Sequence, residues 1–282
     1  MPLSLQKNRG NIFVASGCLL LASLSMPTIA DESANAIDAK LQQAISGDHR
    51  SQKNSARDQY RKPQETLQWL GIKNNMTVVE ITPGSGWYTE ILAPYLKENG
   101  TFYAAGFDVD SKKRYFRRSA KAFNEKLAAN PAVYGKVTVT TIAPPAKIEI
   151  APPGSADMVL TFRNVHSWMG AGNSDAVLGA MYTALKPGGI LGLVEHRGNP
   201  DAEQDPKAKS GYVTEAYTIA MVEKAGFKLV EKSELLANPK DNADHPKGVW
   251  TLPPTLRLGN KDRHKYLAIG ESDRMLLKFV KE

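Results

Sequence analysis

Short apolar runs rich in β-branched residues alternate along the chain with longer amphipathic segments. The first run, residues 76–79, leads through a carboxylate and a glycine turn into an amphipathic segment at 87–96. Comparable runs follow at 101–107, 137–141 and 156–162. Apolar runs of this length, separated by helical segments, are typical of parallel strands that are buried on both faces of a sheet. The pattern therefore predicts an α/β fold.

The same alternation continues in the second half of the chain. Three further runs fit strands, at 190–194, 227–236 and 275–280. The segments with helical periodicity between the strands are 112–129, 175–185 and 212–225. A proline-bearing insertion, which includes residues 249–254, separates the last two strands and is long enough to be a functional loop or a lid. Before the first strand, residues 31–74 predict an N-terminal helical extension, so the main domain is expected at 75–282.

The first 30 residues have the composition of a secretory signal. Lys7 and Arg9 form the positively charged start, and residues 12–24 form an apolar run that is short for a membrane-spanning helix. Ala30 ends a small-residue cleavage site, and Ala36 ends a second one. We therefore expect a periplasmic or secreted protein without stable membrane insertion after cleavage. An uncleaved membrane anchor is the alternative.

Charge and cysteine content exclude several classes of protein. The 282 residues carry a formal net charge of +7, which falls by two, to +5, when Lys7 and Arg9 are removed. Charges of both signs are mixed along the chain, and no basic helix is interleaved with aromatic residues, so nucleic-acid binding is not expected. Cys18 is the only cysteine, and it leaves lipid attachment open as an alternative to cleavage at Ala30. The mature chain could form no disulfide and no thiolate metal site, and no metal is expected.

A glycine turn joins the first predicted strand to the helix that follows. Gly84 and Gly86 stand one residue apart with Ser85 between them, and Glu80 precedes them near the end of the strand. Glycine accepts positive φ and leaves bare backbone against which a ligand can lie. The N–H groups at the start of the helix would face the same ligand. Such a turn at the carboxyl end of the first strand is where nucleotide-like ligands bind in doubly wound sheets.

An acidic residue follows the second predicted strand. Asp108 lies 22 residues after Gly86, at the tip of the strand. A carboxylate in this position can accept hydrogen bonds from both hydroxyl groups of a ribose. We therefore expect Asp108, in preference to Asp110, to bind the ribose of a nucleoside.

Polar side chains gather where the fourth predicted strand ends. The strand runs out into Arg163, Asn164, His166 and Trp168. Imidazole titrates near neutral pH, so His166 is the first candidate for a catalytic general base. The indole of Trp168 could stack against a substrate. The alternative is a structural role, with His166 packed under Trp168.

A second polar cluster follows the fifth predicted strand and contains Glu195, His196 and Arg197. His196 is the second candidate for the catalytic base. Arg197, together with Arg57 and Arg61 of the N-terminal extension, could orient an anionic group of a substrate. Because the fourth and fifth strands are expected to be neighbours, we expect these clusters to converge on one substrate pocket. The alternative is that Glu195 and Arg197 pair at the surface.

Two of these motifs resemble those of the class I S-adenosylmethionine-dependent methyltransferases. Residues 80–86, Glu-Ile-Thr-Pro-Gly-Ser-Gly, are similar to the acidic-x-Gly-x-Gly-x-Gly motif of that family, and residues 185–189, Leu-Lys-Pro-Gly-Gly, resemble its signature before the fifth strand. The resemblance implies a Rossmann-like seven-stranded methyltransferase fold, with a mostly parallel sheet and an antiparallel last strand. It implies S-adenosyl-L-methionine as the cofactor, bound by Glu80, Thr82, Gly84, Ser85, Gly86, Asp108, Arg163 and Asn164.

The turn departs from the family pattern at Thr82, which stands where the first glycine of the motif usually is. A β-branched residue resists positive φ, so we expect the turn to be built differently at this point. The stretches at 60–67 and 163–168, together with the signal, also resemble a group of predicted secreted bacterial methyltransferases.

The expected function is methyl transfer from S-adenosyl-L-methionine to an unidentified small substrate in the cell envelope. A non-catalytic protein of the same fold that binds a nucleoside or another small molecule is the main alternative. A nicotinamide-dependent oxidoreductase and a structural envelope protein are further alternatives. Thr89, in place of the third glycine of Gly-x-Gly-x-x-Gly, argues against the oxidoreductase, as does the turn at 185–189.

Overall fold

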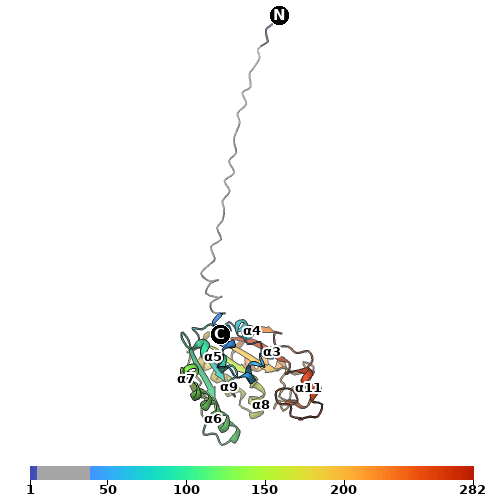
Figure 1. Ribbon diagram of the computed structural model, residues 1–282. Coiled ribbons are helices and arrows are strands. Elements are labelled where there is room, and N and C mark those ends of the chain that lie inside the picture. Colours follow the sequence, from blue (N-terminus) through green and yellow to red (C-terminus); the bar gives the residue numbers. More distant parts are fainter. Residues whose placement is uncertain (5–38) are drawn as a thin grey trace.

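The computed structural model describes residues 1–4 and 39–282 (Figure 1). The apolar run and both cleavage sites of the expected secretory signal lie outside the described residues, so export stays a prediction. Within the described part of the chain, no helix combines the length and the hydrophobicity that crossing a bilayer requires.

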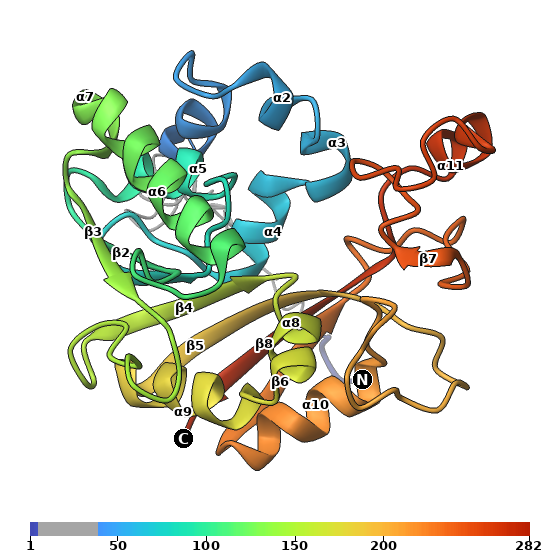
Figure 2. The same cartoon turned by 90° about the horizontal axis from the view of Figure 1, so that it is seen from below.

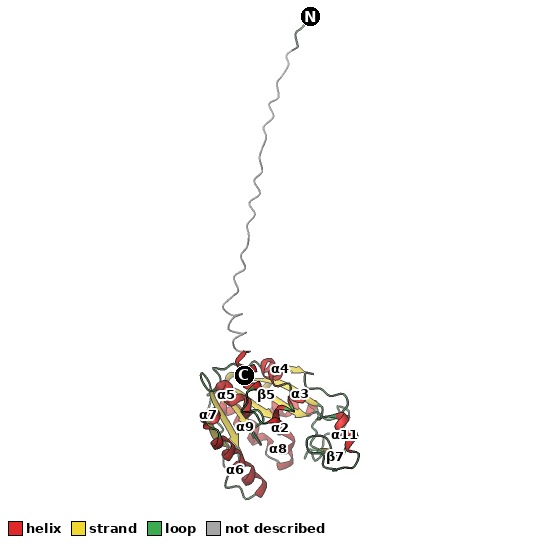
Figure 3. Ribbon diagram, in the orientation of Figure 1, coloured by secondary structure: helices red, strands yellow, loops and turns green. Residues whose placement is uncertain are grey.

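One sheet of seven strands runs through the middle of the domain (Figure 3). In chain order its strands are β1 (Thr77–Ile81), β2 (Thr101–Gly106), β3 (Val137–Thr141), β4 (Ala156–Phe162), β5 (Leu185–His196), β6 (Phe227–Ser233) and β8 (Arg274–Lys281). In space the order is β3-β2-β1-β4-β5-β8-β6. The pairs from β3 to β5 are parallel, whereas β8 is antiparallel to both of its neighbours. This arrangement confirms the predicted Rossmann-like seven-stranded fold.

Helices cover both faces of the sheet (Figure 2). One face carries α4 (Pro63–Leu70), α5 (Thr89–Leu96) and α6 (Arg114–Ala129), and the other carries α8 (Val165–Ala171), α9 (Ser174–Ala184) and α10 (Glu215–Lys224). The shorter elements are α2 (Gln52–Ser55), α3 (Asp58–Arg61), α7 (Pro131–Tyr134), α11 (Arg263–Ile269) and the strand β7 (Pro246–Val249). Residues 39–46 are also helical.

The two faces of the sheet carry separate apolar cores, because alternate side chains of a strand point in opposite directions. Val79 and Ile81 of β1 belong to the core formed with α8, α9 and α10, whereas Val78 belongs to the core formed with α4 and α5. Leu41 of the N-terminal helical residues is buried in the second core. Burial on both faces explains why the strands have continuous apolar sequences.

The N-terminal helices lie over the carboxyl edge of the sheet. Pro63 occupies the first position of α4, where its missing N–H costs no hydrogen bond. Trp87, in the glycine turn, donates its indole N–H to the carbonyl of Asn54 at 2.8 Å. Arg274, at the start of β8, donates to a carbonyl group of α3 at 3.2 Å. These contacts hold α2 and α3 against the ends of β1 and β8.

Strand β5 differs from the expected boundaries. It begins at Leu185 rather than at Ile190, so that the Pro187-Gly188-Gly189 turn is part of the strand. Gly188 has a φ of 75°, and the pairing of β5 with β4 shifts register over this stretch. The glycines therefore form an irregular beginning of the strand, and β5 continues two residues past its predicted end, to His196.

Candidate functional site

Two adjoining cavities open at the carboxyl ends of β1 and β4. The larger cavity has a volume of about 1380 Å³ and the smaller cavity has a volume of about 270 Å³. The residues that line both are Thr82, Gly84, Arg163, Asn164, His166 and Trp250. All but Trp250 belong to the segments that follow β1 and β4, and Trp250 belongs to the insertion. A ligand in one cavity would therefore lie next to a ligand in the other.

Thr82 takes the left-handed backbone conformation that its β-branched side chain was expected to resist. Its φ is 48°, followed by 60° at Gly84 and 78° at Gly86. The N–H of Thr82 donates to the carbonyl of Ala105 in β2 at 2.8 Å, which fixes the end of β1. The expectation of a differently built turn is therefore wrong, because tertiary contacts override the local preference. A left-handed non-glycine residue costs about 1–2 kcal/mol, and such strain is concentrated at ligand sites.

Gly84 and Gly86 have different surroundings although both have positive φ. No atom lies within 4 Å of the position that a Cβ on Gly84 would occupy, and Gly84 lines both cavities. A Cβ on Gly86 would instead meet Phe123 of α6 at 3.2 Å and Lys126 at 3.3 Å. Gly84 is therefore the glycine that is open to a ligand, whereas Gly86 lets α6 pack closely against the turn.

The helix after the turn begins later than the sequence predicts, at Thr89 rather than at Trp87. The N–H of Gly86, near the start of this segment, donates to the carbonyl of Pro83 at 2.9 Å. The carbonyl of Ser85 accepts a hydrogen bond from α6 at 2.8 Å, and Ser85 lines the smaller cavity. The turn is thus held by its own hydrogen bonds and by α6, and fewer helix N–H groups are free for a ligand than expected.

Glu80 is buried beneath the turn and lines the smaller cavity. Its exposed fraction is 2%, and the hydroxyl of Thr89 donates to Oε2 at 2.6 Å. Burial raises the pKa of Glu80 to about 7, although the hydrogen bond from Thr89 and the charges of Lys126 and Arg61 lower it. A carboxyl group that titrates near neutral pH is common at functional sites.

Asp108 lies at the rim of the larger cavity, just after β2. Its Oδ1 accepts hydrogen bonds from Lys147 Nζ at 2.9 Å and from the N–H of Asp110 at 3.1 Å. Both bonds lower the pKa of the Asp108 carboxyl group, with Lys147 contributing the larger effect. Asp108 is therefore charged at neutral pH, as a residue that binds hydroxyl groups should be. Asp110 is not among the residues that line the two cavities.

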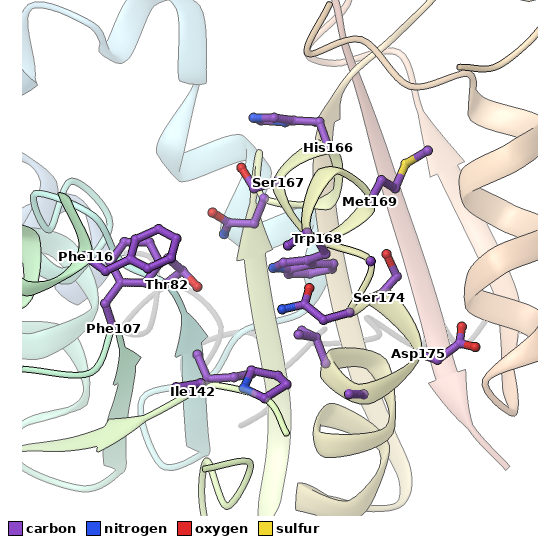
Figure 4. Close-up of a pocket in the computed structure, with 18 of the residues that line it drawn as sticks. Thr82, Phe107, Phe116, Ile142, His166, Ser167, Trp168, Met169, Ser174 and Asp175 are labelled. Atoms are coloured by element: carbon purple, nitrogen blue, oxygen red, sulfur yellow. The ribbon is translucent and has the colours of Figure 1, made fainter. Parts of the chain in front are cut away.

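Aromatic side chains form two opposite walls of the larger cavity (Figure 4). Phe107 and Phe116 stack with their ring centroids 4.4 Å apart on one side, and Trp168 lies on the other. Ile142, which follows β3, also lines this cavity. Such walls suit a flat conjugated ligand such as a nucleobase. The sequence predicted Trp168 as a wall of the substrate pocket, whereas the structure places it in the larger cavity only.

Arg163 and Asn164 turn the chain at the end of β4. Arg163 has a φ of 62°, so the neighbouring strands β1 and β4 are both followed by a residue in a strained conformation. The amide of Asn164 donates to the carbonyl of Ile81 at 2.9 Å and to the hydroxyl of Thr161 at 3.2 Å. These bonds tie the end of β4 to the end of β1 and place both residues against the two cavities.

His166 and Glu195 form a dyad beside both cavities. His166 Nδ1 lies 3.0 Å from Glu195 Oε1, and the N–H of His166 donates to Oε2 at 3.2 Å. The side chain of Glu195 is 0% exposed, and it does not pair with Arg197. Because the carboxylate accepts the Nδ1 proton, Nε2 is the nitrogen that can take a proton from a ligand.

His196 lines the smaller cavity but not the larger one. Its ring centroid is 5.6 Å from that of His166, and Nδ1 lies 2.5 Å from the hydroxyl oxygen of Ser272. Burial lowers the pKa of His196 well below its ordinary value, and the neighbouring His166 and Arg163 act in the same direction. His196 is therefore neutral at physiological pH and a weak base, which favours His166 for that role.

The same residues are the one group in the described part of the chain that could hold a metal ion. Ligand atoms of His166, Glu195 and His196 lie within 4.8 Å of one another. The Glu195 carboxylate, however, already interacts with the His166 ring and with the N–H groups of His166 and His196. Nearby arginines add positive charge that disfavours a cation. We therefore keep the expectation that the site uses no metal.

The arginines expected at the substrate pocket are separated by the structure. Arg57 and Arg61, at either end of α3, line the smaller cavity. Arg197 lines neither cavity, and its guanidinium donates to the carboxylates of Asp273 and Glu234. The expected role of Arg197 in substrate binding therefore has no geometric basis, and Arg197 links the end of β5 to neighbouring segments instead.

Sequence reasoning missed several residues of the site. Arg274 and Trp250 line the smaller cavity, and Phe107 and Phe116 line the larger one. Trp250 lies in the insertion that was expected to be a functional loop or a lid, so its part in the site could have been predicted from the sequence. Arg274 begins a strand and is followed by three apolar residues, where a buried charge is unusual without a partner. The two phenylalanines carry no local signal of a ligand site.

Comparison with known proteins supports the fold. No family model matches the sequence, and no curated protein matches it. A putative sarcosine dimethylglycine methyltransferase from Galdieria sulphuraria is 12% identical, with a TM-score of 0.54 over 82% of this chain and 88% of that one. The (4+2)-cyclase SpnF is 13% identical, with a TM-score of 0.54 over 90% of this chain and 97% of that one. At such low identities the similarity establishes the class I methyltransferase fold alone.

Proposed function

We propose that the protein is an S-adenosyl-L-methionine-dependent methyltransferase that acts on a small substrate. The observation that carries this proposal is the position of His166, which is oriented by Glu195 and lines both cavities. The larger cavity would hold the cofactor and the smaller cavity would hold the methyl acceptor. A base at the junction of two ligand sites is what a transfer between the two ligands requires.

The larger cavity fits the cofactor in three respects. Gly84 leaves open backbone against which a ligand can lie. Asp108 offers a charged carboxylate for the ribose hydroxyl groups, and Phe107 and Trp168 belong to opposite walls that suit the adenine. The other proposed cofactor residues that line this cavity are Thr82, Phe116, Arg163 and Asn164, whereas Glu80 and Ser85 line the adjoining smaller cavity. When bound, the cofactor supplies an electrophilic methyl group on a sulfonium sulfur.

The remaining chemistry belongs to residues of the chain. His166 would accept a proton at Nε2 from the hydroxyl or amine of the acceptor. Glu195 holds Nδ1 protonated and stabilises the imidazolium that forms, as a buried carboxylate does in other histidine dyads. Trp250 lines both cavities, and its ring lies 6.0 Å from that of His166, where it limits access of water to the base.

Two alternatives remain within the same fold. A protein that binds a nucleoside without transferring a methyl group would use the same larger cavity but would not need the His166–Glu195 dyad. A nicotinamide-dependent oxidoreductase is less favoured, since Thr89 replaces the third glycine of the dinucleotide motif and binds Glu80 instead. A protein of similar fold is named as a cyclase, so the fold alone does not determine the reaction, and methyl transfer needs a direct test.

Calorimetric titration tests the proposal. We expect the mature protein to bind S-adenosyl-L-methionine and S-adenosylhomocysteine at one site per chain and to show no saturable binding of NAD. Binding of NAD alone would favour the oxidoreductase. Absence of binding for all three ligands would reject the proposal.

The proposal includes a location in the cell envelope. Its basis is the charged start at Lys7 and Arg9 and the apolar run at 12–24, together with the resemblance to predicted secreted bacterial methyltransferases. Mass spectrometry of protein purified from its native cell is expected to show a mature N-terminus near Asp31. An intact N-terminus in the cytosolic fraction would contradict this location.

A further inference from the structure

Four arginines from distant parts of the chain line the smaller cavity. Arg57 and Arg61 come from the two ends of α3, Arg163 follows β4, and Arg274 begins β8. We call these four side chains the arginine cluster. Like charges repel strongly in a partly buried site, so a cluster of this kind needs negative charge nearby.

Glu271 is the one carboxylate that forms ion pairs with the arginine cluster among the described residues. Its Oε1 accepts a hydrogen bond from Arg57 Nε at 2.5 Å, and its Oε2 accepts one from Arg274 and lies 3.9 Å from Arg61 Nε. The guanidinium of Arg163 forms no hydrogen bond and no ion pair with any described residue. Four positive charges and one negative charge leave a net charge of +3 at the cavity.

Three donor atoms of the arginine cluster are buried without a hydrogen-bond acceptor in the described structure. They are Nη2 of Arg57, Nε of Arg61 and Nε of Arg274. The side chains of Arg61 and Arg274 are each 3% exposed, so bulk water does not satisfy them. A buried donor that lacks a partner costs about 1–3 kcal/mol. The three donors belong to arginines that line one cavity, so the described residues do not fully satisfy the arginine cluster.

The surroundings of the arginine cluster disfavour the charged form of its side chains. Burial lowers the pKa of Arg61 and of Arg163, the latter to about 10, and the neighbouring arginines lower both further. Arg163 is therefore protonated at neutral pH, and a bound anion would stabilise the charged form of both side chains. The other carboxyl group that lines the cavity, Glu80, has a pKa of about 7 and balances little of this charge below neutral pH.

We propose that the smaller cavity binds a doubly charged oxyanion group of the methyl acceptor, such as a phosphate ester or a pair of carboxylates. This inference rests on the proposed function, because the acceptor is assigned to the smaller cavity. A dianion offsets most of the +3 charge, whereas a single carboxylate leaves two positive charges unbalanced. The planar guanidinium groups present paired donors to which the oxygens of either group can bind.

The size of the smaller cavity limits the acceptor. A volume of about 270 Å³ lies just below the range of roughly 300–1,000 Å³ that is typical of small-molecule sites. The charged end of a small molecule fits this space, and the rest of the acceptor extends past His166, which lines both cavities, toward the larger one. Val249, Trp250 and residues 253–255 of the insertion contribute one part of the lining.

Anion binding can be measured through Trp87. Its indole lines the smaller cavity, and the guanidinium carbon of Arg61 lies 4.4 Å from the ring centroid. We would titrate the mature protein with inorganic phosphate, malonate and acetate at constant ionic strength and follow tryptophan fluorescence. We expect saturable binding of phosphate and malonate and at least about 10-fold weaker binding of acetate. A response to phosphate that does not saturate, or equal binding of acetate, would overturn the proposal.

The two dianions distinguish the possible sources of the group. Tighter binding of phosphate than of malonate would indicate a phosphorylated acceptor, and the reverse order would indicate a dicarboxylate. Either order supports the proposal, because both ligands need the same excess of positive charge.

Substitutions test whether the arginine cluster is the binding site. Arg61→Gln and Arg57→Gln are each expected to weaken phosphate binding at least about 10-fold. Arg118→Gln is the control for net charge, because Arg118 is exposed on α6 and lines neither cavity, and we expect it to change binding less than about 2-fold. If Arg61→Gln does not fold, Arg57→Gln decides, since its side chain is 19% exposed. Equal effects of the cluster variants and of the control would contradict the proposal.

A charge change of opposite sign gives an independent test. Glu271→Gln removes the carboxylate that competes with an anion for Arg57 and Arg274. We expect this variant, if it folds as judged by circular dichroism, to bind phosphate more tightly than the wild type. Weaker binding would contradict the charge argument.

The same variants separate this inference from the proposed function. Titration of Arg57→Gln with S-adenosylhomocysteine is expected to give wild-type affinity within about 3-fold, because Arg57 does not line the larger cavity. If phosphate binds through the arginine cluster but S-adenosylhomocysteine does not bind at all, the proposed function fails and the anion site stands. If S-adenosylhomocysteine binds and phosphate does not, the anion site alone is rejected.

Discussion

The carboxylate of Glu195 holds His166 at two points, with Oε1 3.0 Å from the imidazole Nδ1 and Oε2 accepting the backbone N–H of His166 at 3.2 Å. The carboxylate belongs to β5 and the histidine to α8, so the pair joins the ends of two neighbouring strands. This relationship fixes the ring at the junction of the two cavities and determines which nitrogen is free.

The first prediction is that substitutions in the His166–Glu195 dyad lower the rate of methyl transfer but leave cofactor binding intact. His166→Gln is expected to lower kcat by about 10²- to 10⁴-fold, because it removes the general base. Glu195→Gln is expected to lower kcat as well, since an amide does not stabilise the imidazolium. Both rates would be measured with the acceptor that supports transfer, beside calorimetric titration with S-adenosylhomocysteine.

The control for the first prediction is His264→Gln, because His264 is exposed on α11 and lines neither cavity. It should leave kcat unchanged. Full activity of His166→Gln would remove His166 from the mechanism.

The two glycines of the turn should respond differently to alanine. Gly84→Ala places a methyl group in open space at the cavities and a residue at a φ of 60°, so we expect weaker binding of S-adenosylhomocysteine and a stability loss of about 1 kcal/mol. Gly86→Ala adds contacts with Phe123 and Lys126 at 3.2 and 3.3 Å, so we expect the larger loss of stability. Chemical denaturation and calorimetry measure the two effects. A stronger binding defect in Gly86→Ala than in Gly84→Ala would contradict the assignment.

The raised pKa of Glu80 predicts a pH dependence of stability. The folded protein holds the proton of Glu80 up to a pH of about 7, whereas the unfolded chain releases it near 4.5. The stabilisation from the neutral carboxyl group is therefore complete below pH 4.5 and is lost as the pH rises to about 7. The loss amounts to roughly 3 kcal/mol for a shift of this size.

Glu80→Gln isolates this contribution, because the amide has a similar shape and does not titrate. The free energy of unfolding of wild type and variant would be measured by urea denaturation at pH 5 and pH 8. We expect the wild type to lose stability relative to the variant at the higher pH. Parallel behaviour of the two proteins would show that Glu80 titrates normally.

Asp108→Ala tests the ribose assignment. Loss of hydrogen bonds to a charged acceptor costs about 1.5–3 kcal/mol, or roughly 10- to 150-fold in the affinity for S-adenosylhomocysteine. Asp110→Ala is the matched control, because Asp110 is an exposed carboxylate two residues away that lines neither cavity. Equal affinities of the two variants for S-adenosylhomocysteine would refute the assignment.

The arrangement of the sheet could be predicted because its central strands are buried on both faces. β4 was expected at 156–162 and occupies those residues, since a short, mostly apolar run between turn residues has few alternative structures. The short elements β7 and α11 of the insertion were not predicted, because four to seven residues carry too little periodic signal. Boundaries marked by glycine, as at the start of β5, depend on register shifts that only the paired strand determines.

Those residues of the site that lie just after a predicted strand could be identified from the sequence. Asp108 and His166 were identifiable because each lies within four residues of the end of a predicted strand. The left-handed conformation of Thr82 was not, since tertiary packing overrides the preference of a β-branched residue. The arginine cluster was partly hidden because the contact between Arg57 and Glu271 spans 214 positions of the chain, and no local pattern reports it.

The most direct test of the central claim is a crystal structure of the protein with S-adenosylhomocysteine bound. We predict that the adenosyl group occupies the larger cavity, with the ribose hydroxyl groups on Asp108 and the base beside Trp168, and that the sulfur faces His166 at the junction with the smaller cavity. Electron density for the ligand elsewhere, or a sulfur that faces away from the smaller cavity, would contradict the claim that these two cavities form a methyl-transfer site.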